Sequence, residues 1–257
     1  MKKLLLLASA LLVCLYANAQ ALFLLSPDFS SGKALWMVKA GVNFNNASGS
    51  WKDTQINSWE KLHKNLPLSN KFPMQTGFNL SVIFNKSFGY HPLYWGMEFG
   101  LGTRGYKANA EWSKHTTSSG WGDAISHVVK QNITLSAFNI EYHPFIIGYK
   151  YKFLKNMAAD LHVSAFASYD FAGTSKVYNY DYQLSSNTPR EKESTTSIKI
   201  KDIDSYNSFD AGFNLGLGYW YGHFNIDLSW QRGFIKIYDI NDSCYAQSLK
   251  LKLGYAF

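Results

Sequence analysis

The feature that most constrains this chain is a two-residue alternation of apolar with small or polar side chains. In SFDAGFNLGLGYW, residues 208–220, Phe, Ala and Leu alternate with Asp, Gly and Asn. The segment SLKLKLGYAF, residues 248–257, repeats the pattern with Lys250, Lys252 and Gly254 at the opposite positions. Successive side chains of a strand point to opposite faces, so each segment predicts a strand with one apolar and one polar face.

An antiparallel sandwich would show the same alternation, with two apolar faces packed together. Two features favour a membrane-spanning barrel instead. The polar faces are rich in Gly, which suits a narrow, curved interior. The apolar faces run unbroken for about 9 to 11 residues, the length that a tilted strand needs to cross a bilayer.

The connections between these segments alternate between two classes. Short connections within residues 88–95, 141–153 and 218–224 are dense in Tyr, Trp and Phe, as in an interfacial girdle. Long polar connections lie at residues 46–73, 106–131, 173–203 and 235–245. This predicts an all-β fold, an eight-stranded antiparallel transmembrane up-and-down β-barrel in the outer membrane, with both termini in the periplasm. Strands are expected near residues 34–45, 74–85, 93–105, 132–143, 158–171, 205–219, 222–234 and 246–257.

The first 33 residues are expected to lie outside this barrel. Residues 1–19 predict a signal peptide, because two lysines precede an apolar stretch at residues 4–16 and a small-residue cleavage motif at residues 17–19. Residues 20–33 would form a periplasmic lead-in, and residues 34–257 the barrel domain.

Composition argues against several function classes. Without Lys2 and Lys3 the chain keeps 25 − 2 = 23 basic against 18 acidic residues, a net charge of +5, and no basic run dense enough for nucleic acid. The histidines are scattered without metal-ligand spacing, so neither a metal nor a cofactor is expected. Cys244 is the one cysteine left after cleavage, so no internal disulfide is expected.

Charged side chains on the polar faces are expected inside the barrel. An eight-stranded interior is only wide enough for side chains to fill it, and an isolated ion there would be costly, so opposite charges should pair. A sealed wall is the favoured interpretation, and a narrow channel for small solutes is the alternative. The expected lumen polar network comprises Glu98, Arg104, Asp210, Asp227, Lys250 and Lys252, together with Asp170 and Glu141.

A lipid-modifying enzyme is a further alternative. His162 and Ser164 are spaced to share one face of a strand, and some eight-stranded lipid A deacylases pair His with Ser in a similar way. Both residues are expected on the lumen face near a periplasmic turn, away from acyl chains, and no third residue to orient the His is evident. The chain is therefore expected not to be an enzyme.

Two sets of aromatic residues suggest contacts outside the lumen. Tyr255 and Phe257 end the last strand and are expected to serve as the C-terminal signal that the barrel assembly machinery recognises, while the apolar wall faces outer-membrane lipid. Tryptophans in the long connections would either anchor a partner or glycan or pack the loops themselves. These tryptophans are Trp51, Trp59, Trp112 and Trp121.

Three segments resemble the PorT-like outer-membrane β-barrel family of the Bacteroidetes type. They are KAGVNFN (39–45), GMEFGLGTRGYK (96–107) and FDAGFNLGLGYWY (209–221). The resemblance implies an eight-stranded barrel in the outer membrane of a Gram-negative bacterium. The family's namesake is linked to protein secretion, and most members have no assigned activity. The function expected from this is a structural or interaction role, accessory to protein secretion or envelope assembly, with an envelope or secretion protein as partner.

Overall fold

The computed structural model describes residues 34–62, 64, 66–88, 92–116, 125–154, 156–185, 188–239 and 242–257. The predicted signal peptide and lead-in lie outside the described residues, and so does Trp121. Strands of one antiparallel sheet make up most of the described chain. Over these residues no helix is both long enough and apolar enough to cross a bilayer.

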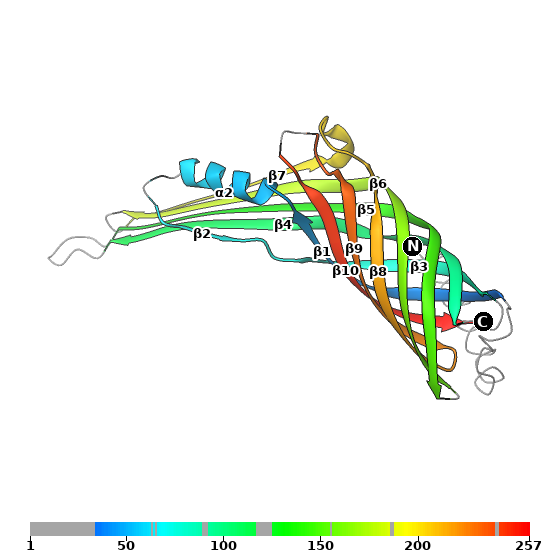
Figure 1. Cartoon of the computed structure of the whole chain (residues 1–257). Coiled ribbons are helices and arrows are strands. Elements are labelled where there is room, and N and C mark those ends of the chain that lie inside the picture. The colour runs from blue at the N-terminus through cyan, green and yellow to red at the C-terminus, as the bar shows by residue number, and fades with distance from the viewer. Residues whose placement is uncertain are drawn as a thin grey trace, which may run out of the picture.

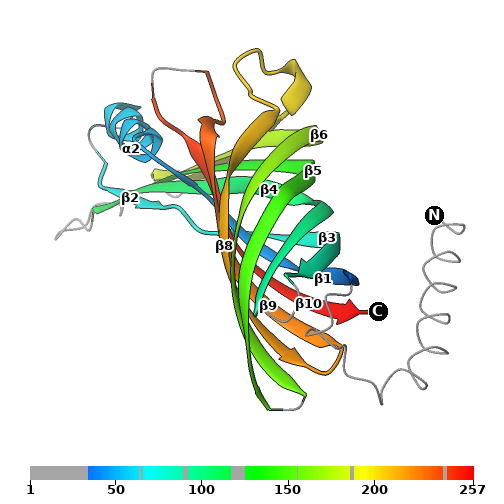
Figure 2. The same cartoon turned by 45° about the vertical axis from the view of Figure 1, so that its right-hand side comes forward.

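Eight strands form a ring in which each strand is hydrogen-bonded to two neighbours (Figures 1 and 2). The ring closes between β1 and β10, where Met37 lies opposite Ala256 and Phe44 opposite Leu249. Closure leaves no ring strand with an open edge against lipid. The predicted eight-stranded antiparallel barrel is therefore confirmed. In ring order the strands are β1 (Ala34–Ser48), β3 (Gln75–Ser87), β4 (Leu93–Thr116), β5 (Ile125–Leu154), β6 (Met157–Ser185), β8 (Phe209–Tyr221), β9 (Phe224–Lys236) and β10 (Tyr245–Ala256).

The outer wall of the ring carries a belt of exposed apolar side chains. Burial alternates residue by residue, so that on β9 Leu228 is 45% exposed while Asp227 is 0% exposed. A wall that exposes apolar side chains on every strand is compatible with hydrocarbon but not with water. Members of the belt include Trp36, Phe78, Phe99, Ile147, Val163, Leu217, Ile226 and Leu253.

Three ring strands continue beyond the belt and form a sheet that projects from one end of the barrel, to the left in Figure 1. β4, β5 and β6 are 24, 30 and 29 residues long, well beyond the roughly 10 residues that span a bilayer. Two strands outside the ring complete this sheet: β7 (Thr188–Lys199) pairs with β6, and β2 (Leu68–Lys71) pairs with β4. We call this sheet the extension; it comprises β2, β7 and residues 106–116, 125–135 and 174–185.

The expectation of long loops at residues 106–131 and 173–203 is therefore wrong. Within the second of them, β6 runs on to Ser185 and β7 returns antiparallel to it, with Val177 opposite Thr196. Along β6 three tyrosines still alternate with polar residues at positions 178–183, but β7 is almost entirely polar, so this hairpin lacks the strong apolar alternation of the ring strands. In the connection between β6 and β8, β7 is followed by the short 3-10 helix η1 (Ile200–Asp202) and then by residues 203–208.

Helix α2 (Trp51–Leu62) packs against the extension and is also absent from the sequence prediction. Its Trp59 ring donates from Nε1 to Gln131 Oε1 at 2.6 Å, and Trp112 Nε1 donates to the carbonyl oxygen of Trp59 at 3.2 Å. Trp51 and Tyr106 place their ring centroids 4.5 Å apart. These three tryptophans therefore pack the chain against itself. This is the packing role considered for them above, and not the anchoring of a partner or glycan. The cluster beneath α2 comprises Ala47, Trp51, Trp59, Tyr106, Ala108, Ala110, Trp112, Val129, Leu135, Ala137, Ile200, Ile237 and Cys244.

The opposite end of the ring holds the tight connections, and we call it the turn end. β5 ends at Leu154 and β6 begins at Met157, while β8 ends at Tyr221 and β9 begins at Phe224. The expected short connection within residues 141–153 is wrong, because β5 continues through it. Pro144 is accommodated by a shift of register between Tyr142 and Phe145, a β-bulge that removes the need for a proline N–H in the ladder.

Candidate functional site

The candidate site is the polar lumen, where charged side chains from seven of the eight ring strands meet. All six residues of the expected network point inward and make ion pairs, but they divide into three groups rather than one. Each group contains partners that the sequence analysis does not name.

The group nearest the turn end is built around Asp227. Lys39 Nζ lies 2.8 Å from Asp227 Oδ2. His162 lies between two carboxylates, with Nδ1 2.8 Å from Asp160 Oδ1 and Nε2 3.4 Å from Asp227 Oδ2. Gly216 gives this imidazole its place, because a Cβ there would lie 2.2 Å from His162 Nε2. The glycine on the polar face is thus required by close packing inside the barrel.

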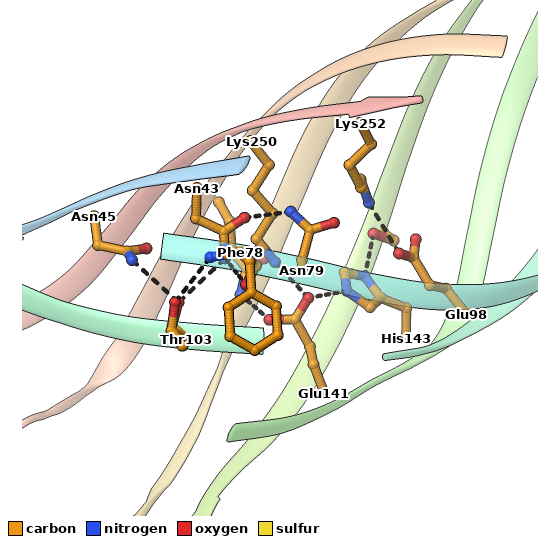
Figure 3. Close-up of polar contacts among 12 residues, drawn as sticks. Asn43, Asn45, Phe78, Asn79, Glu98, Thr103, Glu141, His143, Lys250 and Lys252 are labelled. Carbon is orange, nitrogen blue, oxygen red and sulfur yellow. Dashed lines mark hydrogen bonds and ion pairs between the residues drawn. The ribbon is translucent and has the colours of Figure 1, made fainter. Parts of the chain in front are cut away.

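The middle group is centred on Glu141 (Figure 3). Its Oε1 accepts from Lys250 Nζ at 2.5 Å and from His143 Nε2 at 2.7 Å, and its Oε2 accepts from Gln231 Nε2 at 2.8 Å. Close by, Lys252 Nζ donates to Glu98 Oε1 at 2.9 Å. Charge-assisted hydrogen bonds of this kind compensate the desolvation of buried ions.

The third group lies towards the extension and pairs one guanidinium with two carboxylates. Arg104 Nε lies 2.7 Å from Asp170 Oδ2, and its Nη1 lies 2.9 Å from Asp210 Oδ2. The Tyr206 hydroxyl donates to the same oxygen of Asp170, and Arg104 Nη2 donates to the Asn207 carbonyl at 3.4 Å. This group ties β4, β6 and β8 together across the barrel.

Amide side chains fill the interior beside the middle group (Figure 3). Asn43 Nδ2 donates to the carbonyl oxygens of Phe78 and Thr103, both at 3.1 Å, and Asn45 Nδ2 donates to Thr103 O at 3.1 Å. A cavity of about 30 Å³ remains beside them, lined also by Arg104, Glu141 and Lys250. Such a volume has room for about two water molecules and is too small for a sugar or an amino acid.

His162 and Ser164 both face the lumen, as expected, but they are not paired with each other as the lipid-modifying alternative would require. Ser164 Oγ lies 2.8 Å from Nδ1 of His143 instead, and His143 in turn contacts Glu141. Ser, His and Glu therefore form a hydrogen-bonded chain. Ser164 is only 4% exposed, however, and it does not line the 30 Å³ cavity. Over the described residues no group of His, Cys, Asp and Glu has the arrangement of a metal site.

Several lumen residues are missing from the sequence prediction for identifiable reasons. Lys39 and Asp160 alternate with apolar residues in the same way as Lys250 and Lys252, so the same pattern could have found them. His143 is different, because the Tyr-His-Pro motif suggests a turn and the bulge at Pro144 breaks the period of two. A strand assignment through the proline would have been needed to place this histidine inside.

The aromatic residues at the C-terminus lie on the outer wall at the turn end. The Tyr255 ring contacts Phe224 and Phe257, with centroids 5.3 Å apart in each case, and stacks on His223 at 5.7 Å. The Phe257 N–H donates to the Trp36 carbonyl at 2.9 Å, which fixes the last residue against β1.

The solved structures that resemble this protein are only distantly related to it in sequence. No curated protein sequence is detectably similar to the chain. Ail, the attachment invasion locus protein of Yersinia pestis, is similar in structure, with 13% identity, a TM-score of 0.32, and coverage of 88% of this chain and 99% of Ail. Neisserial surface protein A matches with 10% identity, a TM-score of 0.33, and coverage of 86% and 97%.

The sequence pattern of one protein family matches most of the chain. The outer membrane protein β-barrel domain matches residues 18–239, which includes most of the ring. The closed ring and its apolar belt are the architecture that this description implies. The chain therefore belongs to the outer membrane protein β-barrel domain family and is an outer-membrane protein.

Proposed function

We propose that this protein is a non-enzymatic outer-membrane wall that displays the extension outside the cell to a protein partner. The observation that carries the proposal is the extension itself, in which β4, β5, β6 and β7 form an ordered sheet with α2 packed on it. Flexible loops would connect ring strands without the entropy cost of ordering so many residues. An ordered surface is worth that cost when it has to present a fixed shape.

The specific role that we propose is accessory to protein secretion or envelope assembly, as the PorT-like resemblance implies. In this role the turn end and both termini face the periplasm, Tyr255 and Phe257 are read by the barrel assembly machinery, and the extension contacts an envelope or secretion protein. Long segments of outer-membrane barrels lie on the external side, which supports this orientation.

The filled lumen favours a sealed wall over a channel. Ion pairs link opposite sides of the barrel, and the 30 Å³ cavity beside them leaves no room for a nutrient-sized solute. We therefore treat Glu98, Arg104, Asp210, Asp227, Lys250 and Lys252 as a network that seals and stiffens the barrel.

The test is a pull-down from detergent-solubilised outer membranes, with an affinity tag placed just after Gln20 so that Phe257 stays free. In a shortened variant an Asn-Gly turn replaces residues 178–195, joining Val177 to Thr196, which already lie opposite each other. A Gly222→Asn variant is the matched control, because it alters the turn end, where Gly222 has a φ of 56° that Asn tolerates.

We expect the unmodified protein and the Gly222→Asn control to retain a defined set of envelope proteins that the shortened variant loses. For each of the three proteins, slower migration on a gel after boiling than before boiling verifies that the unboiled protein is folded. Recovery of the unmodified barrel alone, or equal recovery of partners by the shortened variant, would contradict the proposal.

A lipid-modifying hydrolase is the second candidate, and one observation favours it: the chain from Ser164 Oγ through His143 to Glu141. Burial of Ser164 and the ion pair between Glu141 and Lys250 weigh against it, because a nucleophile must reach its substrate. Under our proposal, lipid A from cells with Ser164→Ala carries the same acyl chains as lipid A from unmodified cells. A Ser164-dependent loss of an acyl chain would establish the enzyme instead.

A further inference from the structure

A groove on the outer wall crosses β8, β9 and β10 near the end of the barrel that bears the extension. It has a volume of about 450 Å³ and is lined by Phe213, Trp230, Arg232, Gly233, Phe234 and Tyr245. Phe213 of β8 lies opposite Arg232 of β9, so two of the lining side chains are direct cross-strand neighbours. Most of its surface is aromatic, and it opens away from the lumen.

The rings of the groove support one another. Phe213 meets Trp230 edge to face with centroids 5.3 Å apart, and it lies 5.6 Å from Phe234. Trp230 and Phe234 remain 37% and 62% exposed. Packed aromatic side chains lose little conformational freedom on binding, so this surface is prepared to receive an apolar chain.

Arg232 is the unusual member of this surface. On the outward face of β9 it stands between Trp230 and Phe234, in a row that otherwise consists of Phe224, Ile226 and Leu228. The ion pairs found within the described part of the chain do not include Arg232, whereas Arg104 in the lumen is held by two aspartates. A guanidinium on the lipid side of a barrel is costly unless it reaches an interface or an anion.

A bilayer lipid can supply both an anion for Arg232 and an apolar chain for the exposed aromatic rings. A phosphate headgroup matches the planar fork of a guanidinium, which forms two parallel hydrogen bonds with it. The acyl chain of the same lipid would cover the exposed rings, whereas a soluble anion would leave them bare. The groove lies in the belt, so a membrane lipid is already beside it.

We propose that this groove binds a phosphorylated membrane lipid, with the phosphate on Arg232 and an acyl chain across Phe213, Trp230 and Phe234. The site makes one position on the circumference of the outer wall selective for phosphorylated lipids. This inference is independent of the partner and of the orientation proposed above.

The test compares two lipids that share their acyl chains and differ in phosphate, dioleoyl phosphatidylglycerol and dioleoylglycerol. Each is added to the full mature protein in detergent, and the bound lipid is counted by native mass spectrometry. We expect the unmodified protein to retain the phosphatidylglycerol about tenfold better, as a charge-assisted contact implies. Arg232→Gln should bring the ratio close to one, and Phe234→Ala should lower retention of both lipids.

Lys176→Gln is the matched control, because Lys176 is an exposed cation on the extension, away from the groove. It should keep the preference of the unmodified protein. Gel mobility before and after boiling verifies that each variant is folded. Equal retention of the two lipids by the unmodified protein, or an unchanged preference after Arg232→Gln, would overturn the proposal.

Discussion

Glu141 shows how single residues hold the lumen together. Its carboxylate accepts hydrogen bonds from Lys250, His143 and Gln231, which come from β10, β5 and β9. Removing two charges together often costs little, whereas removing one leaves the other buried and unpaired. The lumen pairs are therefore sensitive to single substitutions, and this asymmetry can be measured.

The pair of Lys252 with Glu98 provides the first prediction. Lys252→Met leaves the Glu98 carboxylate without its closest cation, so we expect the free energy of unfolding to fall by about 3 to 5 kcal/mol. The double variant Lys252→Met with Glu98→Leu should recover most of this loss. Urea unfolding in lipid vesicles, followed by tryptophan fluorescence, measures both, and Lys192→Met on exposed β7 is the control. Equal losses in the single and double variants would contradict the pairing.

Gly216 provides the second prediction. A valine there would press against the His162 ring, because even a Cβ would lie 2.2 Å from Nε2. We expect Gly216→Val to lower the free energy of unfolding by about 1 to 3 kcal/mol, as overpacking does. Ala165→Val, on the lipid face of β6, is the matched control and should change little. Equal free energies of unfolding for the two variants in the same urea experiment would contradict this prediction.

At the scale of elements, α2 and the extension form a second packed unit at one end of the barrel. The Trp51 N–H donates to the Ser243 carbonyl at 3.0 Å, which joins the start of α2 to the connection between β9 and β10. Cys244 follows directly and is fully buried in the cluster beneath α2. Burial raises the pKa of its thiol to about 12.

Cys244 therefore reports on the docking of α2. Thiolate is the reactive form, so a thiol with a raised pKa reacts slowly at pH 8. Trp51→Ala should open the cluster, lower this pKa towards its usual value and expose the sulfur, and we expect alkylation by a maleimide to become at least about tenfold faster. Ser58→Ala, on the exposed face of α2, is the control. An unchanged rate after Trp51→Ala would show that α2 does not protect Cys244.

The sequence predicts the ring strands far better than it predicts α2 and the extension. Ring strands such as β8 and β9 must put apolar side chains towards lipid at every second position, so their pattern is visible. The hairpin of β6 and β7 touches neither lipid nor a deep core, and its polar residues resemble a loop. Helix α2 is held mainly by Trp51 and Trp59, eight positions apart, which is too sparse a signal for an amphipathic helix.

For the whole molecule, the ring and the inward direction of its charges follow from the sequence, but the partners of those charges do not. The alternation places Asp227, Glu98 and Lys252 inside, yet it contains no information on how the strands close around the axis. That Lys39 of β1 pairs with Asp227 of β9 depends on the closure of β1 on β10 and on the stagger of the strands.

A sealed lumen predicts the electrical behaviour of the protein. In a planar lipid bilayer we expect no steady conductance steps from the purified protein, because ion pairs and amides fill the interior. A porin purified from the same membranes serves as the positive control. Steady steps that scale with the amount of protein would favour the channel alternative.

The most direct test of the display role is the side of the membrane on which the extension lies. Glu193→Cys places a thiol on exposed β7, and Asn156→Cys places one in the turn between β5 and β6. A membrane-impermeant maleimide added to intact cells should label the first variant, and it should label the second only after the outer membrane is permeabilised. Labelling of Asn156→Cys but not Glu193→Cys in intact cells would place the extension in the periplasm and contradict display at the cell surface.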